Sequence, residues 1–407
     1  MRRVDRVLGR PLAALLTAVR RVLPEPRRPA PADVRRVLFV KLSEMGAVVL
    51  AAPAFAEVEH VFPGAEVWLL CFDENAEIAE TAAGIPAARV LRAPSSGAVG
   101  TLLGLLRVVR RVRALRFDVV VDLEYLSRVG AVLTYLSGAP VRSGFHRFAA
   151  EGLYCGDLYT HRLTFNPYLH IAQSMVTLVR AAARDPEGAP LLKEAPPALA
   201  ELRFPRHTPQ AATRDGVLAK LRALGVPDGA PLLLVNPNSS DLLPLRRWPV
   251  ERFVEVCRIL RDRVAGAYVV LTGAPHEAAL GGRILELLRT EPGGDARCVS
   301  LIGQTDLREL LSLFTLARVL VSADSGPPHF AVLTDLRVVT LFGPETPALY
   351  GPVNDRNRAL TLGLACSPCI HAWNSRVSTC TDNRCMREMD AAWVAETALR
   401  QIADAAR

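Results

Sequence analysis

The chain alternates between short apolar runs and helical segments once its N-terminal segment ends. Runs without polar alternation predict strands at 37–40, 67–71 and 117–122. Such runs are typical of strands that are covered on both faces, as in a parallel sheet. A helix is expected between the first two strands, over 47–61. The first half of the chain therefore predicts a doubly wound α/β domain.

The same alternation restarts after a Pro-rich stretch. Strands are expected at 232–235, 268–271, 299–302, 319–322 and 338–341, with helices that include 249–263 and 307–315. Two such runs predict two facing doubly wound Rossmann-like domains, with an inter-domain cleft at the carboxyl ends of the strands. The expected boundaries are an N-terminal domain at 32–190, a linker at 191–212, a C-terminal domain at 213–385 and a C-terminal helix at 386–407.

Residues 1–31 precede the first domain as a basic helix and a stiff Pro-rich linker. Over 1–23, apolar residues recur at helical spacing among arginines, and Pro11 is expected to bend or divide the helix. Such a helix can lie on the anionic inner membrane surface, or it can pack on the protein itself. No apolar run reaches the ~20 residues of a membrane span, and no secretory signal is evident. We expect a cytoplasmic protein that is peripheral to that membrane.

Composition narrows the class of partner. The 407 residues are enough for two cores, and the net charge of +8 favours an anionic partner. Only 6% of the residues are aromatic, and no basic stretch is interleaved with aromatic side chains. Binding of single-stranded nucleic acid is therefore not expected.

The loop after the first predicted strand is the first candidate for chemistry. It reads Lys41-Leu-Ser-Glu-Met-Gly46, and in a doubly wound sheet it opens at the ligand-binding edge. Glu44 in this loop can act as a general base toward an acceptor hydroxyl, or it can simply face solvent. Ser43 is a candidate acceptor contact, and Gly46 suits the entry into a helix.

Two further loops follow strands of the second domain. Arg246 and Arg247 are placed where two cations can clamp a diphosphate, although they can also be a surface pair. Asn236 and Ser239 offer neutral donors beside them. Glu277 can accept hydrogen bonds from ribose hydroxyls, or it can stabilise the start of a helix.

The strongest local pattern is Ser-Ala-Asp-Ser-Gly-Pro-Pro-His at 322–329. A strand ends, an acidic residue follows, and Ser-Gly opens a helix whose free amides can bind phosphate. His329 lies one turn into that helix and can equally be a packing histidine. The candidate donor contacts from this pattern and from the next strand end are Asp324, Ser325, Gly326, His329, Gly343 and Thr346.

The strand ends of the first domain carry Arg128, His146 and Arg147, which are candidates for contacts with an acceptor phosphate or sugar. Structural roles remain open for all three. Near the C-terminus, two close cysteine pairs have the spacing of a structural zinc knuckle, with reduced thiols or redox-active pairs as alternatives. The four candidate ligands are Cys366, Cys369, Cys380 and Cys385.

Taken together, the motifs resemble glycosyltransferase family 9, the heptosyltransferases of lipopolysaccharide core assembly. The resemblance covers about 37–386 and is carried by KLSEMGAVVLAAPAF, NPNSSDLLPLRRWPVERF, SADSGPPHFAVL, VVTLFGPETPALYGP and the CSPC tail. It implies a GT-B fold and an inverting, metal-independent transfer of heptose from ADP-heptose to a lipid A–linked sugar.

The resemblance also implies roles for individual residues. Asp324 would contact the donor sugar, and the amides of Ser325 and Gly326 would hold the diphosphate. Arg246 or Arg247 would supply the phosphate-binding cation, and Glu277 would bind the ribose.

One position departs from the family pattern. The family's first loop usually contains Gly-Asp, and that aspartate is its expected base, whereas Gly46 is followed here by Ala47. Glu44 lies three residues earlier and is our hypothesis for the base. The departure leaves open a different acceptor or donor, or a catalytically inactive protein that binds sugar nucleotides or lipid-linked sugars. A nucleotide-sugar epimerase of the same two-domain shape is a separate alternative.

Overall fold

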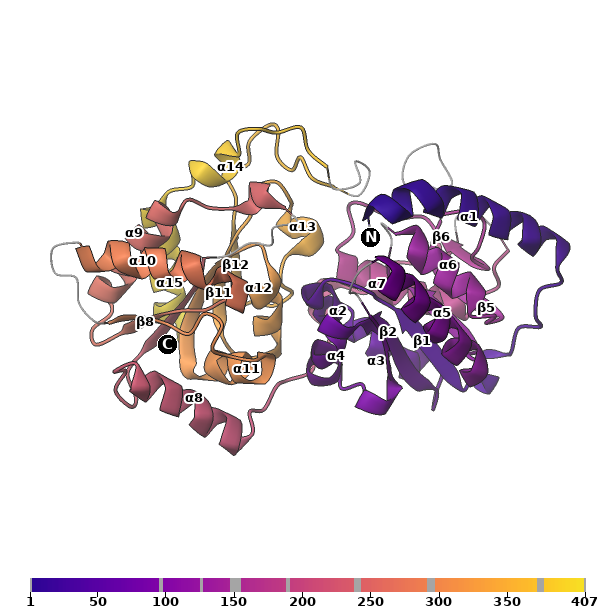
Figure 1. Ribbon diagram of the computed structural model, residues 1–407, viewed down its shortest axis with the longest axis horizontal. Coiled ribbons are helices and arrows are strands. Elements are labelled where there is room, and N and C mark those ends of the chain that lie inside the picture. Colours follow the sequence, from indigo (N-terminus) through magenta and orange to yellow (C-terminus); the bar gives the residue numbers. More distant parts are fainter. Residues whose placement is uncertain are drawn as a thin grey trace. The chain divides into compact units, whose positions relative to one another are not determined.

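A computed structural model describes residues 2–94, 98–124, 127–146, 155–187, 191–237, 243–290, 297–371 and 377–405. The chain forms two compact units (Figure 1). The first is Met1–Pro205 with His371–Val377, and the second is Arg206–Ile370 with Ser378–Arg407. Each unit contains one six-stranded sheet, so the predicted pair of doubly wound domains is confirmed.

The sheet of the first unit has the strand order β3-β2-β1-β4-β5-β6, and its paired strands are parallel. Its apolar strands are covered on both faces, which explains why their sequences do not alternate. The three strands expected in this half are confirmed as β1, β2 and β4. The bounds are β1 (Arg36–Val40), β2 (Glu66–Phe72), β3 (Val90–Ala93), β4 (Val119–Asp122), β5 (Val141–Phe145) and β6 (His161–Leu163).

Helices cover both faces of this sheet. The helix expected over 47–61 is divided at Ala51, because Pro53 lacks an N–H and starts a new helix in its first turn. The N-terminal helix instead continues through Pro11 as one element, so of the expected bend or division the division was wrong. The bounds are α1 (Arg2–Val22), α2 (Met45–Leu50), α3 (Ala52–Val61), α4 (Ala76–Ala83), α5 (Ala98–Leu115), α6 (Arg128–Leu136) and α7 (Ile171–Ala182).

The second unit repeats the plan with the strand order β12-β11-β10-β7-β8-β9. All five strands expected in this half are present. The strands are β7 (Leu232–Asn236), β8 (Tyr268–Leu271), β9 (Cys298–Ser300), β10 (Ala317–Ala323), β11 (Arg337–Leu341) and β12 (Asn357–Leu360). The helices are α8 (Ala211–Ala223), α9 (Val250–Arg263), α10 (Ala278–Thr290), α11 (Leu307–Leu316), α12 (Gly326–Phe330), α13 (Pro347–Tyr350), α14 (Arg384–Arg387) and α15 (Ala391–Ala405).

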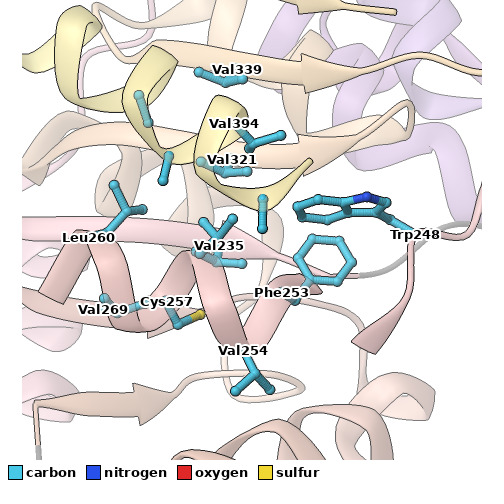
Figure 2. Packing of buried hydrophobic residues seen from close by; sticks show 14 of the residues in the cluster. Val235, Trp248, Phe253, Val254, Cys257, Leu260, Val269, Val321, Val339 and Val394 are labelled. Carbon is cyan, nitrogen blue, oxygen red and sulfur yellow. The ribbon is translucent and has the colours of Figure 1, made fainter. Parts of the chain in front are cut away.

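The core of the second unit anchors one of the candidate loops. Trp248 packs edge-on against Phe253 of α9, with ring centroids 4.8 Å apart, and both are buried (Figure 2). The indole Nε1 of Trp248 donates to the carbonyl of Met389 at 3.2 Å. Truncation of such an aromatic side chain typically costs about 3–5 kcal/mol. The segment just before Trp248, which carries Arg246 and Arg247, is therefore firmly attached.

Register brings the candidate loops to one edge of each sheet. In the first unit, Val40 at the end of β1 pairs with Asp122 at the end of β4. In the second, Ser322 of β10 pairs with Asn236 of β7, and Ala323 pairs with Leu341 of β11. The loops that follow these strands therefore emerge side by side at the carboxyl edge.

Candidate functional site

Glu44 is held in an uncommon backbone conformation. It is exposed and immediately precedes α2, with φ 72° and ψ 89°. A residue other than glycine in this left-handed region stores strain on the order of 1–3 kcal/mol, and such strain persists only where neighbours hold it. The loop thus presents the Glu44 carboxylate from a strained backbone position at the carboxyl edge of the first sheet.

Glu124 is the neighbour that binds this loop, a contact that the sequence did not predict. Its Oε1 accepts hydrogen bonds from Lys41 Nζ at 2.9 Å, from the Leu42 amide at 2.7 Å and from the Ser43 amide at 3.2 Å. Lys41 is buried as well. The available signal was an acidic residue just after β4, the strand that pairs with β1.

Asp122 lies behind Glu124 and is fully buried. Its Oδ1 accepts from the Glu124 amide at 2.8 Å, and its Oδ2 accepts from the Tyr159 hydroxyl at 2.7 Å. Burial raises the pKa of the Asp122 carboxyl to about 7, although both hydrogen bonds act to lower it. A Cβ at Gly130 would lie 2.6 Å from the carboxylate oxygens, so only glycine fits there.

The acceptor candidates have different surroundings. Arg128, the first residue of α6, is only 3% exposed and its side chain lies against Gly9 of α1. His146 directly follows β5, and partial burial lowers its pKa. The backbone amide of Ser43 donates a hydrogen bond to Glu124. Arg147 lies outside the described residues. Arg128 is therefore covered by α1 instead of lining an open surface.

The second unit gathers an arginine and two carboxylates from three loops. Arg246 Nε lies 3.2 Å from Asp324 Oδ2, and Arg246 Nη1 donates to the Asp324 carbonyl at 3.2 Å. Arg246 Nη2 also forms an ion pair with Glu345. Glu345, whose side chain is 1% exposed, was not singled out in the sequence, although it lies between Gly343 and Thr346. The cluster is an arginine shared between two acids.

The neighbouring donor candidates differ in how exposed they are. Arg247 is exposed next to buried Trp248. The side-chain Nδ2 of Asn236 donates to the Thr272 carbonyl at 2.9 Å, and Glu277 Oε2 accepts from the Ala274 backbone amide at 2.6 Å. Ser239 lies outside the described residues. Of the two arginines, Arg247 is the one whose side chain faces solvent.

The Asp-Ser-Gly pattern forms the turn into α12. The Ser325 hydroxyl donates to the Ala323 carbonyl at 3.0 Å, Gly326 is the first helical residue, and His329 is buried. After β11, a Cβ at Gly343 would lie 2.5 Å from Met386 Sδ. Thr346 accepts a hydrogen bond from the Ala348 amide at 3.3 Å and so begins α13.

The expected zinc site is not supported. Within the described residues, no group of three or more His, Cys, Asp or Glu side chains is placed to hold a metal ion. None of the four candidate cysteines, which all lie in the described ranges, forms a disulfide. Burial, followed by the neighbouring thiols, raises the pKa of Cys385. Cys385 also packs tightly against Gly343, since a Cβ added at Gly343 would lie 3.0 Å from the Cys385 sulfur. This packing role explains a buried cysteine at position 385 without a metal ion.

No helix in the part of the chain that the structure describes combines the length and apolar composition needed to cross a membrane.

Solved structures with the same architecture define the class as the GT-B fold. A family 9 glycosyltransferase from Veillonella parvula superposes with a TM-score of 0.69 at 19% identity, covering 92% of this chain and 99% of that one. The E. coli ADP-heptose lipopolysaccharide heptosyltransferase II superposes with a TM-score of 0.68 at 17% identity, covering 91% and 100%. These similarities confirm the expected fold.

The family is defined at the sequence level. The family model described as glycosyltransferase family 9 (heptosyltransferase) matches residues 105–378. The chain belongs to glycosyltransferase family 9.

Curated relatives give the same affiliation. Lipopolysaccharide heptosyltransferase 2 of E. coli is 32% identical over 123 residues, which are 30% of this chain and 34% of that protein. The Salmonella typhimurium heptosyltransferase 2 alignment likewise spans 36% of that protein's length, at 31% identity over 32% of this chain. The chain thus aligns with about a third of these relatives. Lipopolysaccharide heptosyltransferase 1 of Salmonella typhimurium is 25% identical over 82% of this chain and 94% of its own length.

Proposed function

We propose that the protein transfers heptose from ADP-heptose to a lipid-linked saccharide acceptor, with inversion at the anomeric carbon. The observation that carries the proposal is the Arg246–Asp324 pair, formed by the two motifs that the resemblance assigns to the donor. Membership of family 9 and similarity to E. coli heptosyltransferase structures with ADP and with ADP-2-deoxy-2-fluoro heptose support the choice of donor.

In the proposed donor site, the two arginines have different tasks. Arg246 is already balanced by Asp324 and Glu345, so it orients Asp324 toward the sugar. Arg247 is exposed and supplies the cation for the diphosphate. The amides of Ser325 and Gly326 complete the diphosphate contacts, and Glu277 meets the ribose.

In the proposed reaction, Glu44 takes the proton of the acceptor hydroxyl. The acceptor oxygen attacks the anomeric carbon as the bond from that carbon to the diphosphate oxygen breaks, and ADP leaves. One displacement inverts the configuration. Arginine side chains stabilise the charge that develops on the diphosphate, and we propose that no metal ion is needed for this.

We further propose that the protein acts at the cytoplasmic face of the inner membrane, with α1 as its lipid contact. One side of α1 packs on its own unit through Gly9, Ala13 and Thr17. Large apolar side chains remain exposed on the other, including Leu15 at 61% and Val22 at 84%. The helix can therefore fulfil both expected roles, since one face packs on the protein and the other face is available to contact lipid.

The first test is transfer by the purified protein with ADP-heptose and a lipid-core acceptor extract, with and without EDTA. We expect the wild type to transfer heptose in both conditions. Glu44→Gln should lose transfer but keep its affinity for ADP, and Asp324→Ala should lose transfer and bind ADP-heptose more weakly. If the wild type binds ADP-heptose but consumes no nucleotide sugar, Ala47 marks an inactive binding protein and the enzyme proposal fails.

The lipid contact is tested by flotation with vesicles that contain anionic phospholipid. The double variant Leu12→Glu/Leu15→Glu should leave the vesicle fraction, because both side chains are exposed on α1. Leu199→Glu is the matched control, since Leu199 is 40% exposed elsewhere in the same unit. Equal flotation of all three proteins would exclude α1 as the contact.

A further inference from the structure

We propose that Glu124 is a positioning residue for glycosyl transfer, because its carboxylate fixes the loop that presents Glu44. The inference rests on the proposed role of Glu44 as the base. It assigns to Glu124 no contact with substrate.

Three consecutive residues of the loop converge on one carboxylate oxygen. Lys41 Nζ and the amides of Leu42 and Ser43 all donate to Glu124 Oε1, at 2.7–3.2 Å. The Glu124 side chain is only 10% exposed, so solvent screens these charge-assisted bonds weakly. The next residue in the chain is Glu44.

The loop is also held from its other side. The Leu42 carbonyl accepts from Asn75 Nδ2 at 2.9 Å and from the Phe72 amide at 3.0 Å. With both polar groups of Leu42 bonded, the loop has little freedom before it reaches Glu44. This attachment explains how the left-handed backbone of Glu44 persists.

Glu124 is itself held by a chain of buried contacts. The Tyr159 hydroxyl donates to Asp122, and the other Asp122 oxygen accepts from the Glu124 amide. Tyr159 packs in the cluster that includes Ala13 of α1. A continuous set of contacts therefore runs from α1 through Tyr159, Asp122 and Glu124 to the loop.

The primary test is the variant Glu124→Gln, which keeps the shape of the side chain but weakens its hold on Lys41 and on the two amides. We expect kcat for heptose transfer to fall by about 10- to 100-fold, the loss that misplacement of a catalytic group can cause. KM for ADP-heptose and the affinity for ADP should stay within about 2-fold of wild type, since the proposed donor residues lie in the other unit.

A double-mutant cycle distinguishes positioning from a general structural effect. In the Glu44→Gln background, Glu124→Gln should cause little further loss of kcat, because the group that it positions is already absent. Glu66→Gln is the matched control. Glu66 also accepts from two arginines, Arg36 and Arg89, but it lies at the start of β2, far along the strand from the loop, and should leave kcat unchanged.

Folding is controlled separately, because Glu124→Gln leaves the buried ammonium of Lys41 without its counter-charge. The neutral double variant Lys41→Met/Glu124→Gln removes both charges. It should unfold near the wild-type temperature and still show the loss of kcat. Full wild-type kcat in this folded variant, or losses that add in the cycle, would overturn the positioning role.

The outcomes also separate this inference from the proposed function. If Glu44→Gln retains transfer, Glu44 is not the base and the positioning role fails with it. If Glu44→Gln abolishes transfer while Glu124→Gln keeps full kcat, the proposed function stands and only the positioning role fails.

Discussion

At the residue scale, the main result concerns how charges are paired at the two candidate sites. Arg246 is shared between Asp324 and Glu345, whereas Arg247 next to it is exposed. Lys41 is paired with Glu124. Lys41 and Arg246 therefore each have a specific acid, and removal of one partner should affect stability as well as function.

The two arginines should respond differently to substitution. Arg246→Met leaves Asp324 and Glu345 buried without their cation, so we expect a loss of about 3–5 kcal/mol of stability together with donor binding. Arg247→Gln should cost less stability than Arg246→Met, because Arg247 is exposed, and it should raise KM for ADP-heptose by roughly 10-fold, the effect of losing one charged hydrogen bond. Denaturant unfolding and initial-rate kinetics measure the two quantities. Equal destabilisation by both variants would contradict the assignment.

Asp122 predicts a particular dependence of stability on pH. The pKa of its carboxyl is about 7 in the folded protein and about 4 in the unfolded chain. Between these values the folded state keeps a proton that the unfolded state has lost, so this group makes stability fall as pH rises from about 4 to 7 and then level off. Asp122→Asn should remove that part of the slope, because the amide is isosteric and neutral. Urea unfolding of both proteins at several pH values checks this, and identical slopes would exclude Asp122 as the source.

At the element scale, α1 is built into its unit and not merely attached to it. The Thr17 hydroxyl accepts from the Asp157 amide at 2.9 Å, and Arg20 forms an ion pair with the Asp157 side chain at 2.8 Å. Glu25, just after the helix, accepts two hydrogen bonds from buried Arg142, at 2.7 and 2.8 Å. The helix and the start of its linker are thus both tied to the segment before β6 and to β5.

Gly156 is the position at which this attachment is most sensitive. It has φ +72°, and an added Cβ would lie 2.7 Å from the Ala13 carbonyl and 2.6 Å from the Thr17 hydroxyl. Gly156→Ala should therefore separate α1 from its unit and lower stability by about 1–3 kcal/mol. Gly64→Ala is a control, since Gly64 has a similar φ of +76° but open space around it. Limited proteolysis of the α1 segment should be faster in Gly156→Ala alone, and equal rates would contradict the prediction.

At the scale of the whole molecule, the two sheets have separate cores, and the proposed donor residues belong to the second unit. Glu44, Glu124 and the acceptor candidates belong to the first. The proposed transfer therefore depends on residues of both units, whereas donor binding depends on one.

Calorimetry should reveal this division. ADP at 100 times its Kd should stabilise the second unit by about 2.7 kcal/mol and shift the part of the unfolding transition that belongs to it. The shift should be the same in Glu44→Gln and smaller in Arg247→Gln, which loses the cation proposed for the diphosphate. An equal effect of both variants would show that donor binding is not confined to the second unit.

The sequence by itself determined the fold class and eight of the strands that the structure describes. Strands that are covered on both faces appear in the sequence as local apolar runs. We could therefore predict β1, β2, β4 and the five expected strands of the second unit without tertiary information. The motifs at the strand ends likewise indicated the family. Local patterns also misled, since Pro53 divided one expected helix while Pro11 did not divide another.

Only the tertiary structure decided which side chains meet. Lys41 and Glu124 are 83 residues apart, and Arg246 and Glu345 are 99 apart, so no local spacing links them. Their pairing follows from the order of parallel strands, which places distant loops at one edge of a sheet. The same holds for Arg128, which the sequence offered as an acceptor contact and which packing places beneath α1. Periodicity encodes burial along one element, whereas contacts between elements depend on strand order and on which helix covers which face.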